Sequence, residues 1–391
     1  MKSTFFFLVY ALSFSALADE KIPVIEMGER GGVPNFIARM EKERKAHVAF
    51  LGGSITQNQT GHTAMVPEWL EKTYPEVEFT FTNAGLSSTC SVTGAFRADR
   101  DVFSKGPVDL LVVEFAVNDD QDAGHDRKTA IRGLEGIIRQ YFEANPTGDV
   151  ISVQFVNPQM LEKKQAGEAV VSVEAHKAAA RNYGLAIVDV GQALADEIAA
   201  GTMTWDKDYG GTHPNKLGYR FASDLIIKVI DDTVSGETPQ TVTLPDPLDE
   251  KSYSGATMVD VQTFNWLGGW KYGQVSKELL PVGQIRADYE VYPAIRSDEP
   301  GNYLYYNFSG TMLGAFVLAG PDAGRLEVSI DSGEWMPVDL HHHYSKSLNY
   351  PRSVVLVDDL SDAYHQAAIR TAVGDSEEKK TATILHFQVN R

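Results

Sequence analysis

The sequence predicts two domains: a three-layer α/β/α sandwich with a parallel sheet, followed by an all-β sandwich of jelly-roll type. Up to about residue 234, nearly continuous apolar runs alternate with longer segments of helical period. Such runs are typical of parallel strands covered by helices on both faces. Beyond residue 255, short alternating runs are separated by Gly, Pro and Asp turns, with little helical periodicity. That pattern indicates an antiparallel β sandwich.

The first 18 residues have the layout of a secretory signal peptide. Lys2 supplies an early positive charge, an apolar run follows, and the small-residue sequence at 16–18 precedes Asp19. No other stretch approaches the roughly 18 uninterrupted apolar residues that a spanning helix needs. We therefore expect an exported protein, periplasmic or extracellular, without membrane insertion.

The net charge argues against some classes of partner, and the cysteine content excludes disulfides as a source of stability. The formal net charge is −18, which argues against nucleic acid and anionic membrane surfaces as partners because both would be repelled. Cys90 is the single cysteine, so no intramolecular disulfide can form. Stability must then come from the hydrophobic cores, and roughly 370 residues after the signal peptide are enough for two of them.

The elements expected in the α/β domain follow from these apolar and helical patterns. Strands are expected at residues 47–52, 77–83, 109–116, 149–156 and 185–190. Helices are expected near residues 63–73, 93–104, 126–144, 170–183 and 215–232. Each strand is followed by a helical segment, which is the arrangement that βαβ units require.

The second half of the chain changes in composition. Residues 235–255 are rich in Pro, Ser, Thr and charge, which suits a linker or an extended crossing segment. Strands of the β domain are expected at residues 302–310, 313–320, 325–331, 353–360 and 381–390. The predicted organisation is a signal peptide at 1–18, an α/β domain at 19–234, a linker at 235–255 and a β-sandwich domain at 256–391.

Polar residues follow the predicted strands at the point where each strand ends. Ser54 follows the first strand, Gly85 the second and Asn118 the third, and His213 precedes the last helix. In an open parallel sheet, ligands bind beyond the carboxyl ends of the strands. We therefore expect these four residues to meet at one edge of the sheet.

These residue types suit acyl transfer. A serine hydroxyl becomes an effective nucleophile when a base accepts its proton, and His213 is the expected base for Ser54. The tetrahedral oxyanion needs fixed donors. The backbone N–H groups of Ser54 and Gly85 and the side-chain amide of Asn118 could supply them.

With the motifs GGSIT, NAGLSS, FAVNDD and GGTHPNKLGYR in this order, the sequence resembles the SGNH (GDSL-type) hydrolase superfamily over roughly residues 46–232. The resemblance implies an SGNH, flavodoxin-like fold, with Ser54 as nucleophile, Gly85 and Asn118 as oxyanion donors and His213 as base. Gly-Gly-Ser and His-Pro-Asn are seen particularly in members that act on polysaccharides. The implied reaction needs no metal or organic cofactor.

Three positions depart from the family pattern. Gly53 stands where Asp is usual, Ala116 where Gly is usual, and Gly210 where the Asp that orients the histidine is usual. Three interpretations of the last departure are open. Asp208 could reach His213 from further upstream, a backbone carbonyl could orient the ring in a Ser-His dyad, or the site could have lost or changed its chemistry.

Further polar residues near these motifs are candidates for substrate binding. Gln57, Asn58 and His62 follow the nucleophile, and Asp119 follows the third motif. Glu114 lies in an otherwise apolar strand, so it could be a buried, partnered carboxylate near the site. The alternative for the polar residues is an ordinary solvated loop.

The leading hypothesis is an exported serine esterase that removes acetyl or other small acyl groups from a carbohydrate. A second hypothesis keeps the fold but assigns a glycoside hydrolase that uses carboxylates near the same crevice. A third is a carbohydrate-binding protein with a degenerate site.

Overall fold

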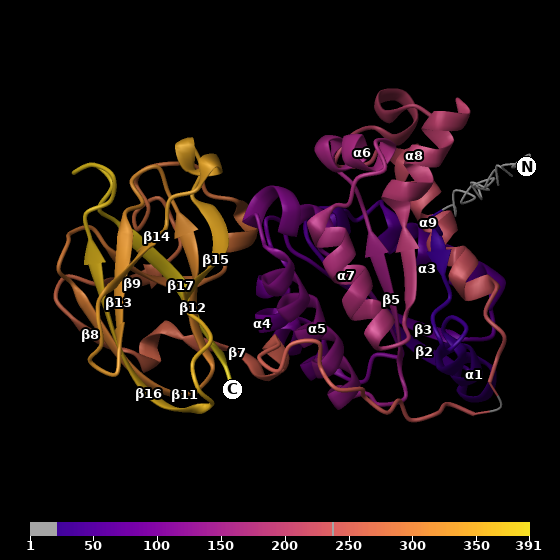
Figure 1. The fold of residues 1–391 in the computed structure, drawn as a ribbon, viewed down its shortest axis with the longest axis horizontal. Helices are drawn as coiled ribbons and strands as arrows, with labels where there is room; N and C mark the ends of the chain where they lie inside the picture. Colours follow the sequence, from indigo (N-terminus) through magenta and orange to yellow (C-terminus); the bar gives the residue numbers. More distant parts are fainter. Residues whose placement is uncertain (1–21, 237) are drawn as a thin grey trace, which may run out of the picture.

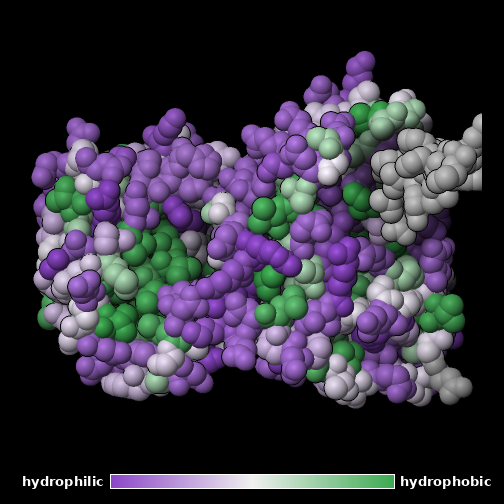
Figure 2. Space-filling view, viewed as in Figure 1, coloured by the Kyte–Doolittle hydropathy of each residue, from purple (hydrophilic) through white to green (hydrophobic). Residues whose placement is uncertain are grey.

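The computed structural model describes residues 22–236 and 238–391, which form two domains (Figure 1). The predicted signal peptide lies outside the described residues. Within the described ranges, no helix combines the length and the apolar character that crossing a bilayer requires. On the face shown in Figure 2, hydrophilic residues cover most of both domains.

A six-stranded sheet in the order β1-β6-β5-β4-β2-β3 forms the centre of the α/β domain. Its strands are β1 (Ile25–Glu26), β2 (Lys45–Gly52), β3 (Glu78–Gly85), β4 (Leu110–Glu114), β5 (Asp149–Gln154) and β6 (Ala186–Asp189). Strands β2 to β6 pair in parallel and confirm the predicted strands. At one edge the sheet gains an additional strand that the sequence did not predict, because β1 pairs antiparallel with β6. A two-residue strand is too short to leave a periodic pattern in the sequence.

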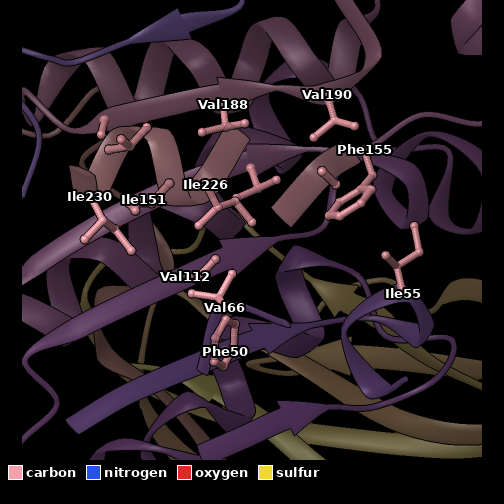
Figure 3. Packing of buried hydrophobic residues seen from close by; sticks show 14 of the residues in the cluster. Phe50, Ile55, Val66, Val112, Ile151, Phe155, Val188, Val190, Ile226 and Ile230 are labelled. Atoms are coloured by element: carbon pink, nitrogen blue, oxygen red, sulfur yellow. The ribbon is translucent and has the colours of Figure 1, made fainter. Parts of the chain in front are cut away.

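Helices cover both faces of this sheet, as predicted. One core contains residues of α1 (Pro34–Glu43), α3 (His62–Thr73), α6 (Pro158–Gln165), α8 (Val190–Ala200) and α9 (Lys216–Asp231). The other contains residues of α4 (Ser91–Asp101), α5 (Arg127–Ala144) and α7 (Val171–Asn182). In Figure 3, Val112 and Val188 of the strands pack toward Ile226 of α9.

The apolar strand runs arise because both sheet faces are buried. Val48 and Phe50 of β2 belong to the first core, whereas Ala49 and Leu51 belong to the second. Successive side chains of a strand point to opposite faces. All four are fully buried, so the strand has no polar face and shows no alternation.

The β domain is a jelly roll. Its strands are β7 (Ala256–Asp260), β8 (Asn265–Leu267), β9 (Lys271–Gln274), β10 (Pro293–Ser297), β11 (Tyr303–Gly310), β12 (Met312–Ala319), β13 (Arg325–Ile330), β14 (Met336–Asp339), β15 (Tyr350–Val357), β16 (Ala363–Ala372) and β17 (Ala382–Asn390). One sheet has the order β15-β12-β17-β10-β9, with β7 beside β17, and the other has the order β14-β13-β16-β11-β8. From β10 onward, the chain passes between the sheets in the pattern of an eight-stranded jelly roll. The predicted fold of this domain is confirmed.

The segment between the domains lies along the α/β domain. Asn35 and Gln240 exchange two hydrogen bonds of 2.7 and 2.8 Å, and Val242 N–H donates to the carbonyl of Pro146 over 2.8 Å. The chain then reaches β7 beside α4 and α5, which face the β domain (Figure 1).

Apolar and charged contacts join the two domains. Ala256 and Met312 of the β domain belong to the core beneath α4 and α5. Arg132 of α5 is buried and forms ion pairs of 2.7 to 2.9 Å with carboxylates of the connecting segment and of the β15–β16 loop. The partners are Asp249, Asp358 and Asp359. The two domains therefore share part of one hydrophobic core.

Candidate active site

A cleft of about 630 Å³ lies between the two domains and contains the predicted nucleophile and base. The α/β domain contributes Ser54, Ser88, Asn118, Asp122 and His213 among its lining residues. The β domain contributes Gln284, Arg286, Tyr344 and Tyr350 among others. The β domain thus forms one wall of the cleft, which the sequence alone did not indicate.

Ser54 lies at the sharp turn between β2 and a short helix. Strand β2 ends at Gly52, and Ser54 is the first residue of α2 (Ser54–Gln57). Its Oγ lies 2.8 Å from His213 Nε2, a hydrogen-bonding distance. The structure therefore brings these two predicted residues together, although they are 159 positions apart in the chain.

Glu114 stabilises this turn through two hydrogen bonds. Its Oε1 accepts hydrogen bonds from Gly53 N–H at 3.0 Å and from Thr56 Oγ1 at 2.6 Å. Burial raises the pKa of Glu114 to about 7, although the hydrogen bonds from Thr56 and Gly53 act in the opposite direction. Glu114 is thus the buried, partnered carboxylate that the sequence suggested. Glu114 does not line the cleft. Its contacts therefore indicate that it positions the turn that carries Ser54 and does not bind substrate.

The departure at Gly53 has a steric reason. A Cβ atom at residue 53 would lie 2.1 Å from Asn118 Oδ1. The Asn118 side chain therefore occupies the space that an aspartate would need. Gly53 lets the nucleophile turn pack directly against the predicted oxyanion residue.

Asp208 does not contact His213. Its Oδ2 accepts hydrogen bonds from the backbone N–H and from the hydroxyl of Thr204, each at 2.8 Å. In the described part of the chain, the His213 ring has one hydrogen bond, to Ser54. The proposed contact of Asp208 with the base is therefore wrong for this structure, and the arrangement is a Ser-His pair without a carboxylate.

The backbone explains why the usual orienting aspartate is absent. Gly210 has a φ of +97°, and a Cβ there would lie 2.6 Å from the Cβ of Asn215. Asn215 caps α9 by accepting hydrogen bonds from the backbone N–H groups of Leu217 and Gly218. Position 210 has neither the backbone conformation nor the space for a side chain, so the cap of α9 excludes a carboxylate at this point.

Gly85 is not placed as an oxyanion donor. Its N–H donates to the side-chain oxygen of Asn83 over 2.9 Å, and it does not line the cleft. A Cβ at residue 85 would lie 2.2 Å from the backbone nitrogen of Gln57. This prediction is corrected: Gly85 is a close-packing glycine that lets α2 approach β3.

Ser88, three residues further along, has the properties expected of the donor. It lines the cleft, and its backbone N–H has no acceptor among the described residues. Its φ of +66° is uncommon for a residue with a side chain. Such backbone conformations concentrate at functional sites. No feature of the sequence indicates this conformation.

Asn118 has its amide fixed at the cleft. The side-chain Nδ2 donates to Asp122 Oδ2 over 2.6 Å, and both residues line the cleft. Burial raises the pKa of Asp122, and the hydrogen bond from Asn118 partly offsets this effect. An amide nitrogen has two hydrogens, so the second one remains available for an oxyanion.

His62 and Asp119 are structural residues and not substrate ligands. His62 is buried against the rings of Phe50 and Phe155, and burial lowers its pKa to about 3. Asp119 is fully buried. Its Oδ2 lies 2.9 Å from His176 Nε2. Neither lines the cleft, so both predictions are corrected.

Gln57 and Asn58 also serve the local structure. Gln57 Oε1 accepts hydrogen bonds from the backbone N–H and the hydroxyl of Ser87. Asn58 Oδ1 accepts hydrogen bonds from the N–H and the hydroxyl of Thr60, at 2.8 and 2.9 Å. Gln57 therefore positions the loop that carries Ser88, and Asn58 closes a turn. Their predicted contact with a substrate is not supported, because neither lines the cleft.

The wall from the β domain contacts the loops that carry Ser88 and Asp122. Arg286 donates to Ser88 Oγ over 2.6 Å, and His342 Nε2 lies 2.7 Å from the carbonyl oxygen of Asp122. Gln121 donates to the hydroxyl of Tyr344 over 3.2 Å. These contacts depend on how the domains pack, so no local sequence pattern could reveal them.

Comparison with known families and structures agrees with this architecture. Residues 50–221 match the model of the GDSL-like Lipase/Acylhydrolase family. No curated protein matches the sequence.

Among solved structures, a two-domain esterase (CEX) active on acetylated mannans, co-crystallised with mannopentaose, is similar with a TM-score of 0.72 and 20% sequence identity. The similarity covers 92% of this chain and 96% of that chain. A second structure of a two-domain esterase (CEX) active on acetylated mannans gives a TM-score of 0.71 at 20% identity, over 92% of this chain and 97% of that one. At this level of identity, the likeness establishes the two-domain fold.

Proposed function

We propose that this chain, in which residues 50–221 match the model of the GDSL-like lipase/acylhydrolase family, is an exported serine esterase that removes acetyl or other small acyl groups from a carbohydrate. The observation that carries the proposal is the 2.8 Å contact between Ser54 Oγ and His213 Nε2 within the interdomain cleft. A hydroxyl in contact with an imidazole is the arrangement that activates serine for attack on an ester carbonyl.

The proposed reaction proceeds through an acyl-enzyme. Ser54 Oγ attacks the ester carbonyl carbon, and its proton passes to His213 Nε2. The tetrahedral intermediate then collapses, the bond to the sugar oxygen breaks, and His213 returns the proton to that oxygen. A water molecule, deprotonated by His213, attacks the acyl-serine ester. The bond to Ser54 Oγ then breaks, His213 returns the proton to Oγ, and the carboxylic acid leaves.

Three donors are available for the oxyanion. The N–H of Ser54 has no intrahelical acceptor because Ser54 is the first residue of α2. The N–H of Ser88 and the amide of Asn118 lie at the same cleft. Fixed donors of this kind stabilise the charge of the intermediate without reorganisation.

A carbohydrate ester is the substrate class that the shape of the cleft and the structural likeness support. The cleft is lined from both domains by polar and aromatic side chains, among them Gln121, Arg286 and Tyr344. The similar two-domain structure is that of an esterase active on acetylated mannans. Export is proposed from the signal-peptide pattern alone.

The lining of the cleft speaks against a glycoside hydrolase. Asp122 is the only carboxylate among the described residues that line it. Glycosidic cleavage uses a pair of carboxylates that flank the scissile bond. Glu114 and Asp119, the other acidic candidates, are buried in hydrogen-bond networks outside the cleft.

The test is release of acetate from acetylated glycans, with hydrolysis of p-nitrophenyl acetate measured alongside. We expect Ser54→Ala to lose more than about 10³-fold in kcat. Ser347→Ala is the matched control, because Ser347 also lines the cleft but is exposed on the wall from the β domain; it should retain activity. Asn118→Ala should lose about 10²-fold or more in kcat.

Each alternative has its own outcome. Wild-type protein that binds glycans but hydrolyses no ester would contradict the enzymatic proposal and favour a binding protein. Ester hydrolysis that survives Ser54→Ala would refute the assignment of the nucleophile. Glycosidic cleavage that survives Ser54→Ala but is lost in Asp122→Asn would favour the glycoside hydrolase.

A further inference from the structure

A second cluster of reactive side chains lies outside the cleft lining described above. Ligand atoms of Cys90, Asp119 and His125 lie within 4.8 Å of one another. Cys90 immediately precedes α4, Asp119 lies in the turn η2 (Asn118–Ala123), and His125 precedes α5. The cluster thus lies where the loops after β3 and β4 meet, on the side of the α/β domain that faces the β domain (Figure 1).

The contact between His125 and Asp119 is an ion-pair contact that is longer than a typical hydrogen bond. His125 Nδ1 is buried and has no hydrogen-bond partner among the described residues. It lies 3.4 Å from Asp119 Oδ1, whereas N–H···O bonds typically span about 2.7–3.2 Å. Two ligands of a tetrahedral zinc ion, with metal–nitrogen and metal–oxygen bonds of about 2.0–2.2 Å, lie about 3.4 Å apart. The spacing therefore fits two ligands of one metal ion.

The Asp119 carboxylate is held in place in the manner of a metal ligand. Oδ1 accepts a hydrogen bond from Ser91 N–H at 2.7 Å. Oδ2 accepts one from Ser91 Oγ at 2.6 Å and lies 2.9 Å from His176 Nε2. Oδ1 retains a second lone pair for a metal, while the bonds to Oδ2 fix the orientation of the group. Metal-bound carboxylates are commonly oriented by such outer contacts.

The cluster is accessible from a cavity of about 490 Å³ between the domains, which Cys90 and His125 line. Ser88 and Asp122 line both this cavity and the cleft with Ser54. A cation could enter by this route, and the cavity has space for a water molecule in a fourth coordination position.

We propose that Cys90, Asp119 and His125 bind a divalent cation of the zinc type, with water as the fourth ligand. A thiolate, an imidazole and a carboxylate around a tetrahedral position suit zinc better than magnesium or calcium. On binding, the Cys90 thiol releases its proton to solvent as the sulfur–metal bond forms. The ion would connect the loop that carries Ser88 to the loop that carries Asn118, and so would stiffen two of the proposed oxyanion donors.

Cobalt titration of the full chain tests this site independently of esterase activity. After dialysis against a chelator, Co²⁺ should bind in a ratio of one to one and produce a near-ultraviolet thiolate-to-cobalt band. Cys90→Ser should abolish this band. His125→Gln should weaken Co²⁺ binding by more than about 100-fold, since even the loss of an outer contact to a metal ligand costs 10–100-fold. Zn²⁺ should displace Co²⁺ and raise the melting temperature of the wild type.

The histidine run at 341–343 is the matched control for adventitious binding. A variant with His341→Gln and His343→Gln should retain the cobalt band. Circular dichroism of each metal-free variant shows whether it is folded, and His125→Gln tests the site if Cys90→Ser does not fold. Absence of the band at saturating Co²⁺, its persistence in Cys90→Ser, or its loss in the control variant would each overturn the proposal.

Discussion

Replacing Glu114 by glutamine tests how the nucleophile turn is built. Glu114 Oε1 accepts hydrogen bonds from Gly53 N–H and Thr56 Oγ1, and a glutamine oxygen can accept the same two bonds. Glu114 Oε2 is buried without a partner among the described residues. The substitution therefore removes an ionisable proton while it conserves the shape and the principal contacts.

The expected magnitude follows from the raised pKa. Burial raises the pKa of Glu114 from its ordinary value of 4.5 to about 7. The folded state therefore holds the proton more tightly than the unfolded chain. As pH rises from 4.5 to 7, the wild type loses stability, and above pH 7 the loss is complete. A difference of about 2.5 pKa units corresponds to about 3 kcal/mol in the free energy of unfolding.

The assay is thermal unfolding of both proteins at several pH values between 4 and 8. At pH values below 4.5 the carboxyl is neutral in both the folded and the unfolded state. The difference in melting temperature between the two proteins there reports only the effect of the buried amide. Relative to the wild type, the melting temperature of Glu114→Gln should then rise by about 4 °C between pH 4.5 and pH 7. Other groups with shifted pKa values, such as Asp149, are present in both proteins and cancel in the comparison. Parallel pH profiles for the two proteins would refute the reasoning.

Three further predictions concern the packing of the site and the domain junction. Gly53→Ala would place a Cβ 2.1 Å from Asn118 Oδ1, so kcat on p-nitrophenyl acetate should fall by about 10²-fold or more. Arg132→Leu removes the buried partner of three partly exposed carboxylates and should cost about 1.5–3 kcal/mol in denaturant unfolding. Lys128→Ala, the control, removes an exposed ion pair and should cost less than about 1 kcal/mol. Tyr344→Ala should raise KM for an acetylated oligosaccharide by up to about tenfold if the ring stacks on a sugar, with little effect on p-nitrophenyl acetate.

The fold could be predicted from the sequence because its central strands are buried on both faces. Strand β4 is a continuous apolar run up to Glu114, and the helix that follows it, α5, is long and periodic. Some of the elements that were missed are short, such as β1, and others begin without a break. Helix α8 starts at Val190, directly after the last residue of β6, so its apolar positions merge with those of the strand.

Only the part of the site that is formed by polar side chains could be predicted from the sequence. Ser54, Asn118 and His213 are polar residues at the ends of apolar elements, so their type and position carry the signal. A backbone donor leaves no such mark. The sequence does not tell which backbone N–H of the loop after β3 is free. In the structure, the N–H of Gly85 donates to Asn83, whereas the N–H of Ser88 has no acceptor among the described residues. The wall from the β domain depends on domain packing and leaves no local pattern.

The two glycines that depart from the family pattern have the same physical explanation. At Gly53 the space for a side chain is taken by Asn118, and at Gly210 it is taken by Asn215. Each asparagine has another task, since Asn118 donates to Asp122 and Asn215 caps the helix that follows His213. An aspartate could replace neither glycine without displacing a residue on which the site depends. The backbone around His213 therefore leaves no place for a carboxylate at position 210. This favours the interpretation of the site as a Ser-His dyad over that of a triad that has lost its carboxylate.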